Sequence, residues 1–403
     1  MEVQRINLDA FRNYAGEGLA LGPGLHVFAG ANAQGKTNLL EAIYLAATGR
    51  SPRTSQESEL IAWEADVARV VAEFASERRG RFTVEISLGR KQPGTGSEAR
   101  KGSGAQKRIK VNGAPRSVGD LAGLVPLVLF LIDDLEIIRG EPARRRAFLD
   151  IDLSAMSRTY AWALRQYTRV VEQRNRLLKE IREGSAAPDD LLAWDAQLAS
   201  FGGRLLEVRA RFVADLNSTS VSVYQGLTAS SQGLTVAYRR DWGPDTDAVV
   251  TREAYAALLL DALAHAHPDE IQRGTSLVGP HRDDLAIMVD GRDIRQYGSQ
   301  GEQRTAALAL RVSEFSLLHQ LFGEAPVLLL DDILSELDRT RRAALLNHLA
   351  PLAQVILTTT DVDAISLPPH ADAHFYYVDH GTVTPLPPEG SLGESDGADA
   401  FAE

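Results

Sequence analysis

The chain has 403 residues, no cysteine, 44% hydrophobic residues and a formal net charge of −11 at pH 7. Without cysteine, disulfide bonds and thiolate metal sites are excluded, and the length and composition are those of a globular protein with two or three domains. No uncharged run approaches the ~20 residues of a membrane-spanning helix, and no leader segment opens the chain, so we expect a soluble, cytoplasmic protein without a membrane partner.

Near the N-terminus, residues 2–8 and 19–29 are predicted to form strands, and Lys36 to about Ala47 a helix. Between the second strand and the helix lies the pattern G-x-x-x-x-G-K-[ST], which is a phosphate-binding loop (P-loop) in its required structural context. Backbone N–H groups of such a loop bind phosphate oxygens at the helix N-terminus, and its lysine neutralises the β- and γ-phosphates. The predicted ATP-binding residues are Gly30, Ala31, Asn32, Ala33, Gln34, Gly35, Lys36 and Thr37.

Residues 67–74, 80–89 and 107–112 predict a small sheet, with a flexible basic loop between the last two strands. Residues 78–110 contain ten Lys or Arg against two Glu, whereas residues 343–403 contain nine acidic residues and neither Lys nor Arg. This uneven charge is typical of a basic surface that binds a partner and of an acidic tail. A solvated hairpin, with charges that serve only solubility, is the alternative for the basic segment. The residues that we expect to contact DNA phosphates here are Lys107, Arg108 and Lys110.

The chain becomes mainly helical from about residue 140. Two apolar heptad seams, in residues 160–181 and 191–212, are separated by a turn rich in small residues, and Arg174 is the one break in the first seam. The pattern predicts an antiparallel helical hairpin about 36 Å long at ~1.5 Å per residue. Two ordinary packed helices of a globular subdomain are the alternative.

Strands and helices alternate again after residue 275. The apolar run Val327–Leu330 predicts a buried strand that ends at Asp331, beside the P-loop, where Asp331 and Thr37 would hold Mg²⁺. Asp332 is then placed to orient or deprotonate an attacking water as the catalytic residue, with a helix N-cap as the alternative role. Because the guanine-selective pattern Asn-Lys-x-Asp is absent from the sequence, we expect ATP and Mg²⁺ as the cofactors.

Three further segments separate this chain from a plain kinase or small NTPase. One opens a helix with small residues, which leave N–H groups exposed to an anion. This first segment is Ser299-Gln300-Gly301. The second segment, Ser335 to Asp338, follows Asp331 and Asp332, and the third, Thr360-Asp361, ends the next predicted strand.

This order of motifs resembles the ABC-type ATPase heads, which include transporter nucleotide domains and SMC proteins. By that resemblance, Ser299 contacts the γ-phosphate of ATP on the opposite head, and Ser335 and Asp338 belong to the D-loop that crosses between heads. Thr360 or Asp361 stands where such heads have a switch histidine. Ser299-Gln300-Gly301 resembles the signature segment of these heads. One P-loop and one signature segment in each chain imply a composite site in an ATP-dependent homodimer. An aspartate, Asp332, in place of the usual Glu implies slow hydrolysis.

Five more stretches, at residues 11–14, 35–42, 49–54, 144–150 and 279–284, narrow the resemblance to RecF proteins over about residues 3–361. It implies a DNA-binding ATPase that dimerises with ATP on single- and double-stranded DNA at gaps or junctions. It also implies weak DNA-stimulated hydrolysis, and action in recombinational and replication-gap repair by helping RecO and RecR to load RecA. DNA or the opposite head would be contacted by Arg144, Arg145 and Arg146, for which a solvated helix face is the alternative.

The expected fold class is α/β. An ABC-type ATPase head would be assembled from both chain ends, residues 1–125 and 275–385. A mainly helical arm domain at residues 126–274 would be inserted between them. The acidic tail at residues 386–403 lacks apolar periodicity, so we expect it to be disordered. A nucleotide-binding subunit of an ABC transporter is the main competing function, and a small-molecule kinase the next. The basic helical arm favours the DNA-binding function.

Overall fold

The structure is a computed structural model that describes residues 1–90, 106–243, 250–350, 352–362, 365, 367 and 372–387. The chain separates into two compact units. The head unit comprises Met1–Ile132 and Leu318–Glu403, and the arm unit Asp133–Leu317. The predicted flexible basic loop and almost all of the predicted acidic tail lie outside the described residues.

The first sheet of the head unit is antiparallel and follows the order β2-β1-β4-β5-β6-β7. Buried side chains alternate with more accessible ones along β4 and β5, as expected of a sheet with one buried face. Three of its strands match those predicted between residues 67 and 112. The bounds are β1 (Glu2–Phe11), β2 (Tyr14–Ala20), β4 (Val67–Ser76), β5 (Gly80–Gly89), β6 (Gln106–Val111) and β7 (Ala114–Arg116).

The second sheet of the head unit carries the nucleotide motifs and has the order β15-β14-β3-β13-β12-β8. All neighbours are parallel except the hairpin of β14 and β15. The predicted strand at 19–29 is in fact the end of β2 and all of β3, because the chain turns at Gly24, whose φ is 98°. The bounds are β3 (Leu25–Ala29), β8 (Leu127–Phe130), β12 (Val327–Asp331), β13 (Val355–Thr359), β14 (Ala373–Asp379) and β15 (Thr382–Leu386).

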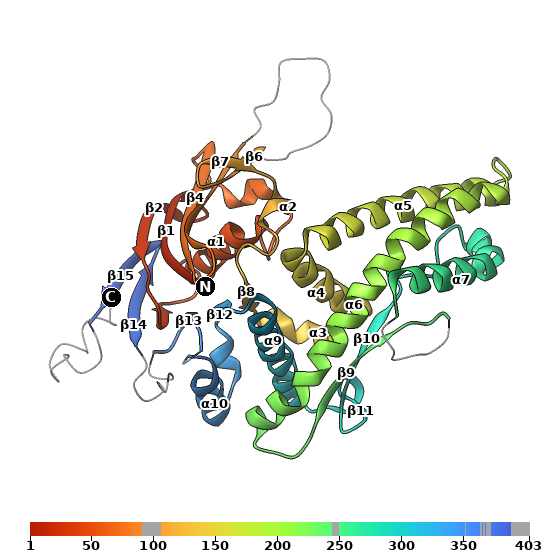
Figure 1. The fold of residues 1–403 in the computed structure, drawn as a ribbon. Coiled ribbons are helices and arrows are strands. Elements are labelled where there is room, and N and C mark those ends of the chain that lie inside the picture. Colours follow the sequence, from red (N-terminus) through yellow and green to blue (C-terminus); the bar gives the residue numbers. More distant parts are fainter. Residues whose placement is uncertain are drawn as a thin grey trace. The chain divides into compact units, whose positions relative to one another are not determined.

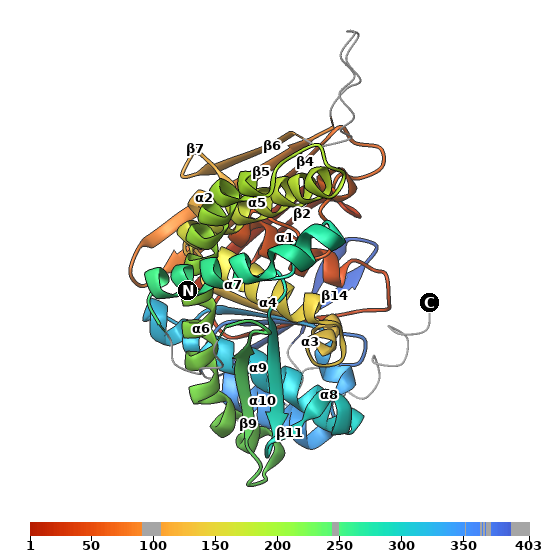
Figure 2. The same ribbon diagram turned by 90° about the vertical axis from the view of Figure 1, so that its right-hand side faces the viewer.

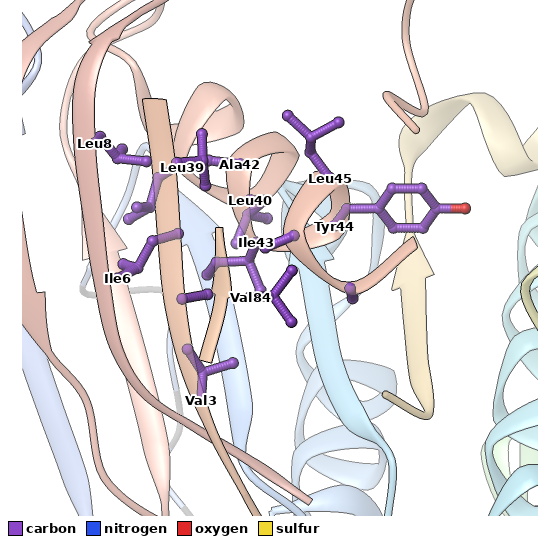
Figure 3. Close-up of a cluster of buried hydrophobic side chains, with 14 of the residues drawn as sticks. Val3, Ile6, Leu8, Leu39, Leu40, Ala42, Ile43, Tyr44, Leu45 and Val84 are labelled. Carbon is purple, nitrogen blue, oxygen red and sulfur yellow. The ribbon is translucent and has the colours of Figure 1, made fainter. Parts of the chain in front are cut away.

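Helix α1 (Lys36–Thr48) lies in the core of the head unit, and most of its side chains are buried. The same hydrophobic cluster includes apolar residues of β1, β5, β12 and β13, so α1 is enclosed by both sheets. Figure 3 shows this cluster, with Val3, Ile6, Leu8, Leu39, Leu40, Ala42, Ile43, Tyr44, Leu45 and Val84 labelled. The shorter elements are the 3-10 turns Glu57–Leu60, Ile132–Asp134 and Ile333–Glu336, and the helices α2 (Val118–Leu121) and α10 (Arg339–Leu349).

The arm unit is mainly helical, with one three-stranded antiparallel sheet in the order β11-β10-β9 (Figure 2). Helix α9 begins in the arm unit and crosses the boundary between the units. The helices are α3 (Leu135–Arg139), α4 (Pro142–Met156), α5 (Arg158–Arg182), α6 (Leu191–Thr228), α7 (Arg252–Arg273), α8 (Ile294–Tyr297) and α9 (Gln300–Phe322). The strands are β9 (Leu234–Arg239), β10 (Asp284–Val289) and β11 (Arg292–Asp293), and a 3-10 turn spans Pro188–Asp190.

The predicted helical hairpin is present as α5 and α6, which run side by side (Figure 1). Helix α6 is 38 residues long, so it extends well beyond its predicted seam. Helix α7 packs against both α5 and α6. The hairpin is therefore part of a layer of three packed helices rather than a free two-stranded coil.

Arg174, the one break in the first heptad seam, is fully buried among these three helices. Its guanidinium is 2.7 Å from Asp195 of α6 and 2.6 Å from Glu270 of α7. It also donates to the hydroxyl of Ser276 at 2.9 Å, and His267 contacts the Asp195 carboxylate at 2.7 Å. The polar residue therefore ties the hairpin together instead of interrupting it.

We expect Arg174→Ala to destabilise the protein by about 3–5 kcal/mol, because it leaves two buried carboxylates without their cation. The free energy of unfolding, measured by urea denaturation, would report this loss. Arg211→Ala is the matched control, since Arg211 of α6 has a side chain that is 68% exposed and lies 3.8 Å from Glu207. A loss for Arg174→Ala as small as that of the control would contradict the structural role of the buried cation.

The boundaries of the two units differ from the predicted ones at both ends of the inserted segment. The head unit continues to Ile132 instead of residue 125, because β8 pairs with β12 in the head sheet. The arm unit continues to Leu317 instead of residue 274, because β10 pairs with β9. The signature segment at Ser299 accordingly belongs to the arm unit.

Candidate nucleotide site

The P-loop connects β3 to α1 in the head unit, as its sequence pattern predicts. The ammonium group of Lys36 lies inside the loop and donates to the carbonyls of Gly30 and Ala31, each at 2.7 Å. Burial lowers the pKa of Lys36, while the charges of Asp332 and Asp331 act in the opposite direction. Lys36 is thus held inside the loop by the loop's own carbonyl groups.

Gln34 connects the P-loop to two turns that are distant in sequence. Its carbonyl accepts hydrogen bonds from the Asn13 amide at 2.9 Å and from the backbone of Gly381 at 3.0 Å. Its side-chain oxygen accepts from the backbone of His380 at 2.8 Å. Gly35 has a φ of 118°, and a Cβ atom there would lie 2.6 Å from the Asn13 amide. The loop conformation is therefore fixed by contacts within the head unit.

Asp331 ends β12 beside the P-loop. Its Oδ1 atom accepts hydrogen bonds from the hydroxyls of Thr37 at 2.9 Å and Thr358 at 2.8 Å. Burial raises the pKa of Asp331, and the hydrogen bonds from the two hydroxyls lower it. The Thr37 hydroxyl and the Asp331 carboxylate are neighbouring oxygen donors of the kind that Mg²⁺ prefers, so the residues present fit this ion.

Asp332 follows at the end of the same strand and has a left-handed backbone conformation, with φ of 50°. Its N–H group donates to the Thr358 hydroxyl at 3.0 Å, and the same hydroxyl donates to Asp331. It precedes the turn Ile333–Glu336, but within the described residues its side chain makes no capping hydrogen bond to that turn. The geometry offers no support for the N-cap alternative.

A buried acidic residue, Glu41, organises a network that the sequence analysis missed. Its carboxylate accepts two hydrogen bonds of 2.9 Å from Arg12 and one of 2.6 Å from the Ser51 hydroxyl. Arg53 is 3.6 Å from Glu41 and donates to Asn38 at 2.9 Å. Three of the stretches that resemble RecF therefore meet around α1. A single acid among the apolar residues of α1 was the signal that could have revealed this network.

The D-loop and switch segments also lie in the head unit. The Ser335 hydroxyl donates to the Asp332 carbonyl at 2.6 Å, and Asp338 caps α10 by accepting a backbone hydrogen bond of 2.9 Å. Thr360 and Asp361 are exposed after the end of β13. The structure thus gives Asp338 a helix-capping role and leaves the two switch candidates accessible.

The signature segment lies at the start of α9. The N–H of Ser299 donates to the Glu302 carboxylate at 2.8 Å, and the N–H of Glu302 donates to the Ser299 hydroxyl at 3.3 Å. This is a capping box, and the hydrogen bonds from Ser299 hold the pKa of Glu302 below its usual value. Ser299 and Gln300 are exposed and Gly301 is half-buried, so the segment is accessible in the arm unit.

The basic residues that we predicted on β6 have unequal surroundings. Lys107 is paired with Glu57. Lys110 is 3.7 Å from Glu85. Arg108 is exposed, and the structure assigns it no ion pair with a described residue. Contact with DNA phosphates at Lys107 and Lys110 would require these cations to exchange their present partners.

The three arginines of α4 also differ. Arg144 is exposed, and Arg146 is half-buried and donates to the Asp283 carbonyl at 2.8 Å. Arg145 is buried and makes two hydrogen bonds to Asp284, at 2.6 and 2.9 Å. Because its guanidinium is enclosed, the predicted DNA contact of Arg145 is corrected to a structural ion pair.

Several curated bacterial proteins resemble the chain over almost its whole length. The model of the RecF/RecN/SMC N terminal domain matches residues 2–375. The DNA replication and repair protein RecF of Chloroflexus aurantiacus is 41% identical over 95% of this chain and 99% of that protein. The protein of the same name in Herpetosiphon aurantiacus is 40% identical over 96% and 100%. The chain belongs to the RecF family. This membership confirms the predicted resemblance and places the chain among DNA replication and repair proteins.

Solved structures with a similar fold support this family assignment. The recombination mediator protein RecF-ATP in the RecFOR pathway has a TM-score of 0.82 and 33% identity, over 96% of this chain and 97% of that chain. An Smc head bound to the C-winged helix domain of ScpA has a TM-score of 0.55 at 15% identity, which shows a shared fold. The predicted ABC-type head is confirmed, and the transporter function is set aside. Among the described residues, no helix is long and apolar enough to cross a membrane.

Proposed function

We propose that the chain is an ATP-operated DNA clamp, which binds ATP with Mg²⁺ in the head unit, dimerises on DNA and hydrolyses ATP slowly. The observation that carries the proposal is the convergence of Lys36, Thr37 and Asp331 at one end of the parallel sheet. The solved structure of RecF-ATP, which is similar over 96% of the chain, supports ATP as the nucleotide.

Each residue of the head site has a distinct proposed role. Lys36 and the loop N–H groups bind the phosphates, while Thr37 and Asp331 hold Mg²⁺. The ion supplies positive charge where negative charge develops on the transferred phosphoryl group. Asp332 orients the attacking water or accepts its proton, and its short side chain favours slow turnover. Slow hydrolysis suits a switch, because the bound state then persists.

The proposed site is completed by a second copy of the chain. Ser299 lies at an accessible helix N-terminus, which suits an anion, and it belongs to the arm unit rather than the head unit. Since each chain has one P-loop and one signature segment, two chains would form two composite sites. ATP would then join two chains, with the D-loop residues Ser335 and Asp338 near the contact.

We further propose that DNA gaps or junctions are the targets, and that RecO and RecR are the partners with which the chain helps to load RecA. The RecFOR pathway of the solved relative supports these partners. Contacts through phosphates would be independent of base sequence. The proposed contact residues are Lys107, Arg108, Lys110, Arg144 and Arg146.

The direct test is the mass of the protein in solution, measured by sedimentation with and without ATP, and with and without duplex DNA. We expect a monomer without nucleotide and a dimer with ATP, with the dimer further favoured by DNA. ADP serves as the control, because it lacks the γ-phosphate that Ser299 would contact. An identical mass with ATP and with ADP would refute the proposed switch.

A further inference from the structure

Helix α5 carries a high concentration of positive charge. Its 25 residues include seven Lys or Arg and two Glu, in a chain whose net charge is −11. Four exposed arginines of this helix follow one another at intervals of seven, four and seven positions. We call them the arginine stripe: Arg158, Arg165, Arg169 and Arg176.

The stripe lies along one line of the helix. At about 100° per residue, its four arginines fall within about 40° of one another around the helix axis, whereas Arg174 falls about 160° away. The same helix therefore has one arginine buried among carboxylates and four on the opposite, exposed face. Arginines that are equivalent by sequence therefore have different surroundings, since Arg174 is buried and the four of the stripe are exposed.

Most of the stripe lacks the partners that a surface helix uses for its own stability. In the described part of the chain, Arg165, Arg169 and Arg176 form neither an ion pair nor a hydrogen bond through their side chains. Glu172 is the one acid between Arg165 and Lys179. Opposite charges four residues apart can stabilise a helix, and Glu172 and Glu180 stand four positions before and after Arg176. In the described structure, however, neither carboxylate forms an ion pair with it. Unpaired guanidinium groups on one face suit an anionic partner.

The stripe is held in a fixed position by the opposite face of α5. Arg174 ties α5 to α6 and α7. Tyr160, Tyr167 and Leu178 of the same helix are buried. These contacts fix the backbone, so binding would order side chains and not the helix itself. Pre-organisation of this kind lowers the entropic cost of binding.

We propose that the arginine stripe binds the phosphate backbone of duplex DNA, as a second contact surface of the DNA clamp. The inference rests on the proposed DNA-binding function and adds a site to it. From Arg158 to Arg176 the helix rises ~27 Å, about the length of eight base pairs of B-DNA. Arginine suits phosphates, which it contacts through two parallel N–H groups.

Duplex DNA is favoured over single strands because, in the described part of α5, only one exposed aromatic residue lies near the stripe, whereas single-strand sites stack successive bases on several rings. That residue, Trp162, is 44% exposed, and it contacts Phe201 in a T-shaped arrangement with 5.5 Å between the ring centroids. Proteins that bind single strands stack bases on aromatic rings. An acidic protein is the other class of partner that could bind the stripe. In that case, removal of the stripe arginines would leave the affinity for DNA unchanged.

The test is the affinity of the full chain for a duplex of about 30 base pairs at several salt concentrations. In the variant, Arg165, Arg169 and Arg176 are all replaced by alanine. We expect the slope of log affinity against log salt to fall by about 2.7, because each phosphate contact contributes about 0.9. Binding at physiological salt should weaken roughly ten- to a hundredfold. The variant with lysine at all three positions should keep the slope.

A control variant replaces three other arginines of the arm unit by alanine: Arg211, Arg252 and Arg273. It removes the same charge, so an equal loss of slope in the control would overturn the proposal. An unchanged slope in the stripe variant would overturn it as well. If the wild-type chain binds no duplex at all, the proposed DNA-binding function itself fails, which is a separate result. Circular dichroism of each variant checks that the fold is kept.

Discussion

Replacement of Lys36 by alanine is expected to weaken ATP binding by about two orders of magnitude, because hydrogen bonds to charged groups contribute roughly 1.5–3 kcal/mol each. The ammonium group is the one cation in the P-loop sequence, and the Gly30 and Ala31 carbonyls already hold it within the loop. Dimerisation should be lost together with binding. Titration calorimetry with ATP, followed by sedimentation at a high nucleotide concentration, would measure both effects.

Asp332→Asn is the informative comparison for Lys36→Ala, since it changes a neighbouring charge without touching the phosphate-binding loop. This variant should bind ATP, hydrolyse it more slowly than the wild type and remain a dimer. If Asp332→Asn hydrolysed ATP at the wild-type rate, another group would have to orient the water. Near-normal ATP affinity in Lys36→Ala would show that the N–H groups of the loop and helix are sufficient for binding.

The parts of the site that depend on local sequence are those that could be predicted. The P-loop, the helix that follows it and the strand ending at Asp331 each rest on a short run of residues. Their meeting follows from topology, since β3, β13 and β12 are parallel neighbours whose ends lie at one edge of the sheet. The hydrogen bond from Thr37 to Asp331 is a consequence of that arrangement.

Features that depend on pairing between distant segments could not be predicted in the same way. The head unit extends to Ile132 because β8 pairs with β12, and no local pattern specifies so distant a partner. Likewise, a run of three arginines looks uniform in sequence, yet Arg145 is buried against Asp284 while Arg144 is exposed. Burial of a charge is determined by its tertiary partners rather than by its neighbours in the chain.

Mixed dimers of two inactive variants are expected to regain ATPase activity if Ser299 acts on the ATP of the opposite chain. Lys36→Ala and Ser299→Arg chains should each be inactive on their own, because both sites of any homodimer that either variant formed would contain one damaged half. In a mixed dimer, one site combines both defects, while the other joins an intact P-loop to an intact signature. Random pairing of independent sites would then restore about a quarter of the wild-type activity.

Sedimentation of the same mixture has to accompany the activity measurement, because heads that close only around two ATP molecules would form no mixed dimer and show no recovery. Mixing each variant with wild-type chain supplies the reference for random pairing. If mixed dimers form with ATP and their activity does not exceed that of either variant alone, action of Ser299 on the opposite chain is to be abandoned. The hydrogen bonds between Ser299 and Glu302 would then describe its whole role, which is to cap α9.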